Sequence, residues 1–364
     1  MIAVHQFVPA LLPRDATGDH TLALRDALRD AGWVSEVYVE AAHDDLWSEA
    51  TYFERYPERA KPGDVLLYQL STASPIAEFL LGRDEPLVLD YHNITPASFY
   101  DGWEEHTRDK VELAREQAAA LAPRAVLGIA DSAFNAGGLE AMGCRSTTVV
   151  PIIVDTEQMC GPVDESERAR LARSRGSSTV LLFVGRLSPN KSQHDLVEAL
   201  LLYRRWFDPE ARLHLVGPSI TPNYTRAIFD FAEELGLRNA IRHGEDLTHA
   251  ELAAWYAEAD VFVCLSEHEG FCIPLLEAMA SGLPIVAYDA GAVGETLGGA
   301  GLLLDSKRPS VVATSVARVA RDPVLAGSLS AAGRQRLGAF SPDTTRARFV
   351  EVLGALEGVR RATV

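Results

Sequence analysis

The sequence predicts an α/β protein with two doubly wound domains, each built on a parallel sheet covered by helices. Apolar segments of strand length alternate with amphipathic segments of helix length in both halves of the chain, an alternation typical of parallel sheets. Between the halves, residues 154–178 lose this periodicity and are rich in Gly, Pro, Ser and charged residues, which predicts a linker. A length of 364 residues suffices for about two domains of ~150 residues, each with its own core.

The first domain is expected to span residues 1–153. Its predicted strands are Ile2–Val8, Val34–Val39, Asp64–Leu70, Pro86–Tyr91, Ala125–Ala130 and Thr147–Ile153. Its predicted helices are Asp19–Ala31, Pro75–Leu81, Glu104–Ala122 and Ala133–Met142. In such sheets ligands bind outside the carboxyl ends of the strands, so polar residues that follow a strand are the candidates for a site.

The second domain is expected to span residues 179–341. Its predicted strands are Thr179–Val184, Arg212–Val216, Ala240–His243, Val261–Leu265, Ile285–Ala287 and Gly301–Leu304. Helical patterns follow at Pro309–Arg321, Val324–Leu337 and Pro342–Arg361.

The most informative stretch lies between two of these strands, from residue 259 to residue 288. A polar loop follows the first strand, and a helix is expected to open near Pro274, where a missing N–H costs nothing. Helix N-termini attract phosphate, and Gly270 lets the backbone approach closely. Glu269 and Glu277 would repel phosphate but accept hydrogen bonds from hydroxyls. The stretch therefore predicts a site for a ligand with phosphates in the middle and a sugar at each end.

The segment EGFCIPLLE, residues 269–277, resembles the Glu-x7-Glu motif of retaining family-4 glycosyltransferases. Three further segments are similar to that family in the same order: FVGRLSPNKS, LHLVGPS and GEDLTHAELAAWYAEADVFVCLS. The similarity is good over residues 179–304 and weak over the first half. It implies the GT-B fold, in which two Rossmann-like domains face a central cleft. In that fold the last helix, here 342–364, crosses back to the first domain.

The resemblance implies a basic pair at the donor diphosphate, Arg186 and Lys191. The chain has four lysines against 30 arginines, and one of the four stands in this loop, although it is followed by Ser192 where the family commonly has glycine. Glu277 would hold the ribose and Glu269 the donor hexose. The implied donor-binding residues are Gly18, Gly185, Arg186, Lys191, Gly217, Glu245, Asp246, Glu269, Gly270, Phe271, Cys272, Ile273 and Glu277.

The same resemblance implies two site residues in the first domain. Gly18 stands in a loop where family members often carry glycine near the donor phosphates or the acceptor, and the following Asp19 is equally well explained as a helix N-cap. His92 follows the fourth predicted strand and resembles the histidine that the family places near the transferred sugar. The alternative is a hydrogen-bonded structural histidine.

The expected activity is that of a metal-independent retaining glycosyltransferase. A sugar would move from a nucleoside diphosphate sugar to an acceptor hydroxyl, with His92, Arg186, Lys191 and Glu269 as catalytic residues. No Asp-x-Asp motif stands at a donor-site strand end, so no metal is assigned, and no cofactor is expected besides the donor. Two alternatives remain: a nucleotide-sugar epimerase of the same fold, and a non-catalytic protein that binds sugar nucleotides.

Composition restricts the partners. A formal charge of −17 argues against nucleic acid and against an anionic membrane surface, which both need basic patches. The excess of acid lies in residues 1–150, with 24 acidic and 12 basic side chains. A solvated acidic surface is the simpler explanation, and the alternative is a neutral or cationic saccharide or small-molecule acceptor rather than an anionic lipid. No run of about 18 apolar residues and no signal-peptide pattern is seen, so we expect a cytoplasmic protein. The nucleobase, peripheral membrane contact and oligomeric state stay open.

The cysteines indicate neither a zinc site nor a disulfide framework. Cys144, Cys160, Cys264 and Cys272 form no CxxC pair and have no histidine at zinc-finger spacing. Cys264 alternates within an apolar strand and is expected in the core. Cys272 stands in the expected phosphate loop, where we expect reagents to reach it.

Overall fold

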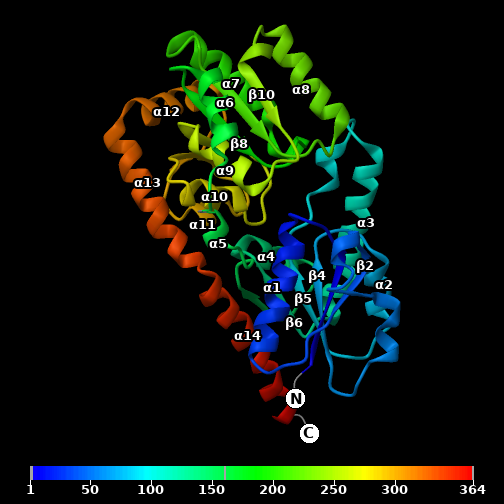
Figure 1. Cartoon of the computed structure of the whole chain (residues 1–364). Coiled ribbons are helices and arrows are strands. Elements are labelled where there is room, and N and C mark those ends of the chain that lie inside the picture. The colour runs from blue at the N-terminus through cyan, green and yellow to red at the C-terminus, as the bar shows by residue number, and fades with distance from the viewer. Residues whose placement is uncertain (1–2, 160, 363–364) are drawn as a thin grey trace. The chain divides into compact units, whose positions relative to one another are not determined.

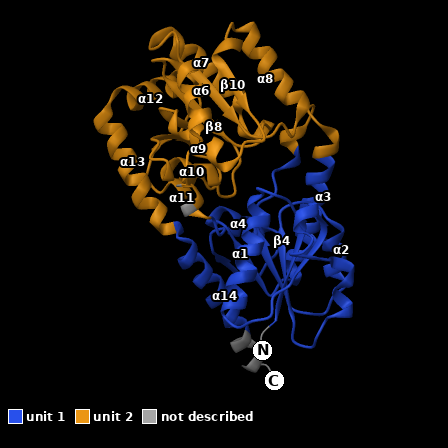
Figure 2. Ribbon diagram, viewed as in Figure 1, with its two compact units in different colours: residues 1–97, 108–154, 340–364 blue, residues 98–107, 155–339 orange. Residues whose placement is uncertain are grey.

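The computed structural model describes residues 3–159 and 161–362, and the chain forms two compact units. Unit 1 holds Met1–Ala97, Arg108–Val154 and Phe340–Val364, and unit 2 holds Ser98–Thr107 and Asp155–Ala339 (Figure 2). The short segment Ser98–Thr107 thus joins unit 2, where Trp103 packs against the ring of Tyr224.

Unit 1 is built on a parallel sheet that has seven strands within the described residues (Figure 1). In spatial order they are β3 (Thr51–Tyr52), β2 (Val37–Ala42), β1 (Val4–Leu11), β4 (Val65–Leu70), β5 (Leu87–Tyr91), β6 (Leu127–Ala130) and β7 (Thr147–Val149). The order changes direction between β1 and β4. The carboxyl ends of these two strands therefore mark a switch point, where such sheets bind ligands.

The helices of this unit are α1 (Ala16–Asp30), α2 (Pro75–Leu81), α3 (Glu105–Leu121), α4 (Ala133–Ala141) and α14 (Pro342–Ala362). The expected start of the first helix at Asp19 is wrong. Asp15 is the N-cap and accepts a hydrogen bond from the backbone N–H of Gly18 at 2.9 Å. Gly18 therefore lies in the first turn of α1 rather than in a loop.

Helix α14 packs on unit 1 through an apolar stripe. Phe349 and Leu353 are buried against Leu24 and Leu28 of α1 and against strand residues such as Val4. Figure 1 shows α14 (red) running alongside α1 (blue). The C-terminal helix thus completes the core of the unit that the first 97 residues begin.

Unit 2 has a second parallel sheet, with six strands within the described residues. In spatial order they are β10 (Ile241–Gly244), β9 (Arg212–Val216), β8 (Val180–Val184), β11 (Val261–Cys264), β12 (Ile285–Tyr288) and β13 (Leu302–Leu304). Its switch point lies between β8 and β11. The helices are α5 (Thr156–Met159), α6 (Glu165–Arg175), α7 (Gln193–Trp206), α8 (Pro222–Glu234), α9 (His249–Ala257), α10 (Ile273–Ala280), α11 (Val293–Leu297), α12 (Pro309–Arg321) and α13 (Pro323–Leu337).

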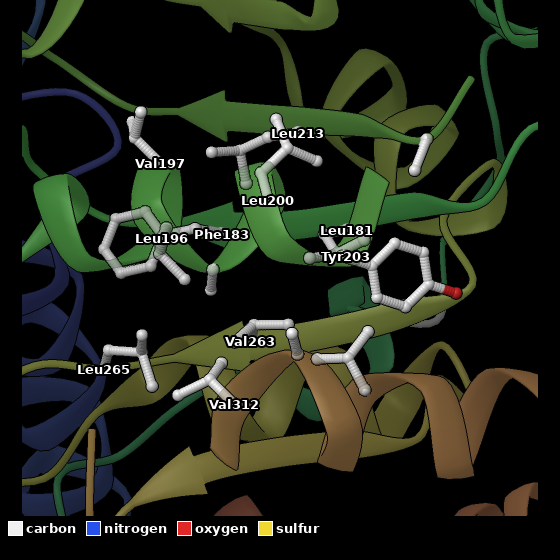
Figure 3. Packing of buried hydrophobic residues seen from close by; sticks show 14 of the residues in the cluster. Leu181, Phe183, Leu196, Val197, Leu200, Tyr203, Leu213, Val263, Leu265 and Val312 are labelled. Carbon is white, nitrogen blue, oxygen red and sulfur yellow. The ribbon is translucent and has the colours of Figure 1, made fainter. Parts of the chain in front are cut away.

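Helices cover both faces of this second sheet. On one face, Leu181 and Phe183 of β8 pack with Leu200 of α7 and Val312 of α12 (Figure 3). Successive strand residues point to opposite faces. Accordingly, His214 of β9 contacts the ring of Trp255 of α9 on the other face, with the ring centroids 4.9 Å apart. Both faces are therefore buried, as the near-continuous apolar strands require.

The segment predicted as a linker contains a helix that the lack of periodicity did not indicate. Residues 165–175 form helix α6. Asp164 caps its N-terminus through two backbone N–H groups, and Trp255 donates a hydrogen bond to Glu167 at 2.9 Å. The helix buries only Leu171, so its sequence carries almost no apolar periodicity.

No helix within the described residues combines the length and the apolar composition needed to cross a membrane.

Candidate functional site

The carboxyl ends of β8 and β11 bring together two of the predicted residues. After β8 the chain turns through a short 3-10 helix, Pro189–Lys191, and after β11 it reaches Glu269. The ammonium Nζ of Lys191 lies 2.6 Å from Oε1 of Glu269, and the two side chains are 13% and 10% exposed. Residues 78 positions apart in sequence thus form a largely buried ion pair at the switch point.

Asn190 connects the two loops that carry this pair through hydrogen bonds. Its backbone carbonyl accepts a hydrogen bond from the N–H of Glu267 at 2.8 Å, and its side-chain Nδ2 donates to the carbonyl of His268 at 3.3 Å. Asn190 is buried. Sequence reasoning missed this residue, because its role depends on a loop nearly 80 residues away.

The backbone around Glu269 is held at close range by a glycine. A Cβ atom at Gly291, where φ is +58°, would lie 2.4 Å from the carbonyl oxygen of Glu269. That carbonyl accepts a hydrogen bond from the N–H of Ala292 at 3.0 Å. Only glycine permits this approach, so the position of Glu269 depends on the loop after β12.

The start of α10 lies directly after this loop. Gly270, Phe271 and Cys272 are buried, and Ile273 is the first helical residue. Cys272 is the N-cap residue and has the left-handed conformation, with φ +73° and ψ +66°. Ser192, which follows Lys191, is also left-handed, with φ +51°. The left-handed conformation at both positions favours glycine, which gives a physical reason for the glycine that the resembled family commonly has after the lysine.

Glu277 lies one turn into α10. Its Oε2 accepts a hydrogen bond of 2.6 Å from the hydroxyl of Tyr256 on α9. Burial raises the pKa of Glu277, and the Tyr256 hydrogen bond partly opposes that rise. Tyr256 was not predicted as part of the site. It fixes the orientation of this carboxylate.

The loops after β8, β9 and β10 are adjacent. A Cβ atom on Gly217, where φ is +135°, would lie 2.3 Å from the carbonyl oxygen of Gly185. His243 donates a hydrogen bond from Nε2 to the carbonyl of Gly217 at 2.8 Å. Glu245 accepts one from the N–H of Ser219 at 3.0 Å, and the neighbouring Asp246 is exposed. The predicted residues of these loops therefore share the sheet edge with Lys191.

Arg186 is exposed at the same edge, and its backbone carbonyl accepts a hydrogen bond from Gln193 of α7. Of the other predicted residues, Gly18 and His92 lie in unit 1. Their predicted part in donor binding stays a prediction.

His92 is held by groups from three strands of unit 1. It follows β5, its Nδ1 lies 3.1 Å from Oδ2 of Asp131 after β6, and its Nε2 lies 2.6 Å from Oε1 of Gln69 on β4. The side chain is 5% exposed. His92 is therefore part of a buried polar network at the carboxyl edge of the first sheet.

The hydrogen-bond directions assign two protons to His92. The carbonyl of Thr21 can only accept, so Gln6 donates to it through Nε2 and accepts through Oε1. Gln69 then donates to Gln6, and its own Oε1 accepts from Nε2 of His92. The other ring nitrogen faces the carboxylate of Asp131. His92 thus donates from both nitrogens, which describes an imidazolium paired with a carboxylate.

The electrostatics agree with this assignment. Burial alone would lower the pKa of His92, but the carboxylates of Asp131 and Asp90 and the hydrogen bond to Asp131 raise it to about 9. Asp90 itself pairs with His20, whose Nε2 lies 2.9 Å away. The result is a cationic His92 at neutral pH.

One of the two cysteines near this loop is placed differently from our expectation. Cys264 is in the core as predicted, but Cys272 is also buried, so the expectation that reagents reach it is wrong. The Sγ atoms of the two residues lie 4.0 Å apart. The side chain of Cys272 therefore faces Cys264 of β11.

Comparison with known proteins finds a family match in the second half of the chain. Residues 165–336 match the family model Glycosyl transferases group 1. The D-inositol 3-phosphate glycosyltransferase of Thermobispora bispora is 32% identical over 211 residues, which cover 55% of this chain and 49% of that protein. A GDP-mannose-dependent alpha-(1-6)-phosphatidylinositol monomannoside mannosyltransferase of Mycolicibacterium smegmatis is 31% identical over 223 residues, which cover 58% and 57%. The chain spans about half the length of these curated relatives.

The fold extends over the whole chain. The crystal structure of Anabaena HepE in complex with UDP and glucose superposes with a TM-score of 0.74 at 20% identity, covering 97% of this chain and 100% of that one. The predicted pair of Rossmann-like parallel-sheet domains, as in GT-B glycosyltransferases, is thereby confirmed. The match to the Glycosyl transferases group 1 model, residues 165–336, therefore lies within one of two Rossmann-like α/β units.

Proposed function

We propose that the protein is a retaining glycosyltransferase that moves a sugar from a nucleoside diphosphate sugar to an acceptor hydroxyl without a metal ion. This proposal rests mainly on the buried Lys191–Glu269 ion pair at the switch point of the second sheet, inside the segment that matches the family model. A cation and an anion at this edge suit a ligand that offers both phosphates and hydroxyls.

Lys191 and Arg186 would stabilise the leaving diphosphate. When the bond between the anomeric carbon and the phosphate oxygen breaks, negative charge grows on that oxygen, and a cation already in place lowers the barrier. The acceptor oxygen forms the new bond to the anomeric carbon, and its proton passes to the leaving phosphate. The backbone N–H groups of residues 270–273, at the start of α10, would assist.

The two glutamates would recognise the sugars. Glu269 uses one oxygen for Lys191, and its carboxylate has a second oxygen for a hydroxyl of the donor hexose. Glu277 would hold the ribose with the orientation that Tyr256 gives it. The loops with Gly185, Gly217, Glu245 and Asp246 would flank the nucleobase.

His92 would act from unit 1 on the far side of the donor sugar. The proton assignment given above uses both ring N–H groups within the protein, so the imidazolium would contribute mainly through its positive charge and by shaping the edge of the sheet. Gly18, in the first turn of α1, would lie near the donor phosphates or the acceptor.

The named relatives suggest the substrate classes. One acts as a D-inositol 3-phosphate glycosyltransferase, another uses GDP-mannose, and the HepE structure holds UDP and glucose. We therefore propose a UDP-sugar or GDP-sugar as donor and a polyol or saccharide as acceptor.

Nucleoside diphosphate release, measured with and without acceptors, tests the proposal. A transferase releases the diphosphate rapidly only with an acceptor present, an epimerase turns over the donor alone, and a binding protein does neither. Lys191→Ala and Glu277→Ala should lower the rate by about 10²- to 10³-fold. Lys110→Ala, an exposed lysine of α3, is the matched control and should retain it. Wild-type transfer by both site variants would refute the assignment.

A further inference from the structure

Next to the Lys191–Glu269 pair lies a cluster of three groups that ligate metals. The Sγ atoms of Cys264 and Cys272 and a carboxylate oxygen of Glu269 lie within 4.8 Å of one another, and all three residues are buried. The proposed transfer uses the backbone N–H of Cys272 and gives the thiol groups of Cys264 and Cys272 no role. The cysteine spacing of eight positions is unlike the short spacings of zinc motifs, so the sequence gives no sign of the cluster.

The geometry fits a tetrahedral ion with thiolate ligands. Zinc–sulfur bonds of about 2.3 Å place two thiolate sulfurs about 3.8 Å apart at a tetrahedral centre. The observed separation of Cys264 and Cys272 is 4.0 Å, so little movement is needed. A carboxylate oxygen is an accepted third ligand, and three protein ligands leave one position for water or another donor.

The local charges also fit a divalent cation. Two thiolates and one carboxylate carry three negative charges, and a divalent ion leaves one of them uncompensated. The ammonium of Lys191, 2.6 Å from Glu269, supplies the matching positive charge. Ser266 lies 3.4 Å from the sulfur of Cys264 and can hydrogen-bond to it as an outer-shell partner.

We propose that Cys264, Cys272 and Glu269 form a binding site for a thiophilic divalent cation such as Zn²⁺. The ion engages Glu269 and lies beside Lys191. If, as proposed above, those residues bind the donor, occupancy by the ion opposes donor binding and inhibits transfer. The inhibition rests on the proposed function, whereas the ion binding does not.

Cobalt absorption tests the site directly on the reduced full-length protein. Co²⁺ replaces Zn²⁺ in thiolate sites and gives a sulfur-to-cobalt charge-transfer band in the near ultraviolet. We expect this band in the wild-type protein at one Co²⁺ per chain, and its loss when Zn²⁺ is added. Cys264→Ser and Cys272→Ser should each weaken binding by at least about tenfold.

Cys144→Ser is the matched control, since Cys144 is a buried free thiol in unit 1 and should leave the band unchanged. Cys272→Gly is a second variant that separates loss of the ligand from loss of the fold, because glycine suits the left-handed backbone there. A wild-type protein without the band, or a band that survives removal of both thiols, would overturn the proposal. A protein that binds Co²⁺ but transfers no sugar would refute only the proposed function.

Discussion

His92 carries a positive charge in a place where burial disfavours one. The carboxylates of Asp131, Asp90 and Asp15 all act electrostatically on its ring, and the ring of His20 packs at 5.3 Å. The neighbouring carboxylates outweigh the cost of desolvation, so the imidazolium and Asp131 depend on each other. Removing one partner would leave the other buried and uncompensated.

The first prediction is a loss of stability at alkaline pH. The pKa of His92 is raised from 6.5 to about 9, so its contribution is fully present below pH 6.5 and is lost as the pH rises through 9. A shift of this size corresponds to about 3 kcal/mol. Urea unfolding across this pH range should show the free energy of unfolding of the wild type falling toward that of His92→Gln. The variant lacks the imidazole, so its free energy of unfolding should not show this alkaline decrease.

The control for this prediction is a variant of an exposed pair. Glu58→Gln removes the partner of Arg55, and both side chains are more than half exposed, so the alkaline profile should match that of the wild type. Parallel profiles for the wild type and His92→Gln would show that His92 is not a buried cation.

The second prediction concerns the close approach of two loops at Gly217. A methyl group at this position would clash with the carbonyl of Gly185, and the positive φ is unfavourable for alanine. Gly217→Ala should therefore lower the free energy of unfolding by about 2 kcal/mol or more. Gly327→Ala, at an exposed helical position of α13 with open space around it, should raise stability by about 0.5–1 kcal/mol. Equal effects of the two substitutions in urea unfolding would contradict this account.

At the scale of elements, α14 contributes its apolar stripe to the core of unit 1. Phe349→Ala should cost about 3–5 kcal/mol, because it leaves a cavity among Leu24, Leu28 and Val4. Arg348→Ala removes only an exposed pair with Glu351 and should change stability by less than about 0.5 kcal/mol. Thermal unfolding of both variants checks the prediction. A Phe349→Ala protein as stable as Arg348→Ala would mean that α14 is not part of this core.

The sequence predicted the elements whose apolar pattern is strong and missed those held by tertiary contacts. The expected strand 179–184 is β8 nearly to the residue, because both of its faces are buried. The two-residue strand β3 and the charged helix α6 carry no such pattern. The start of α1 was misplaced because Asp15 and Asp19 are equally good capping residues, and only the fold decides between them.

At the scale of the whole molecule, part of the candidate site could be predicted from the sequence and part could not. Glu269 was named from its place between a strand and a helix start, and Lys191 through the family resemblance. Their proximity follows because the carboxyl ends of parallel strands share an edge. Asn190, Tyr256 and the pairing of Cys264 with Cys272 could not be predicted. They depend on which side chains point toward each other, which the strand pattern does not specify.

A crystal structure with a bound nucleoside diphosphate sugar is the most direct test of the central claim. We expect diphosphate oxygens within hydrogen-bond distance of Nζ of Lys191 and near the start of α10. Sugar hydroxyls should face Glu269 and Glu277. A ligand bound elsewhere, with the Lys191–Glu269 pair making no contact to it, would contradict the account.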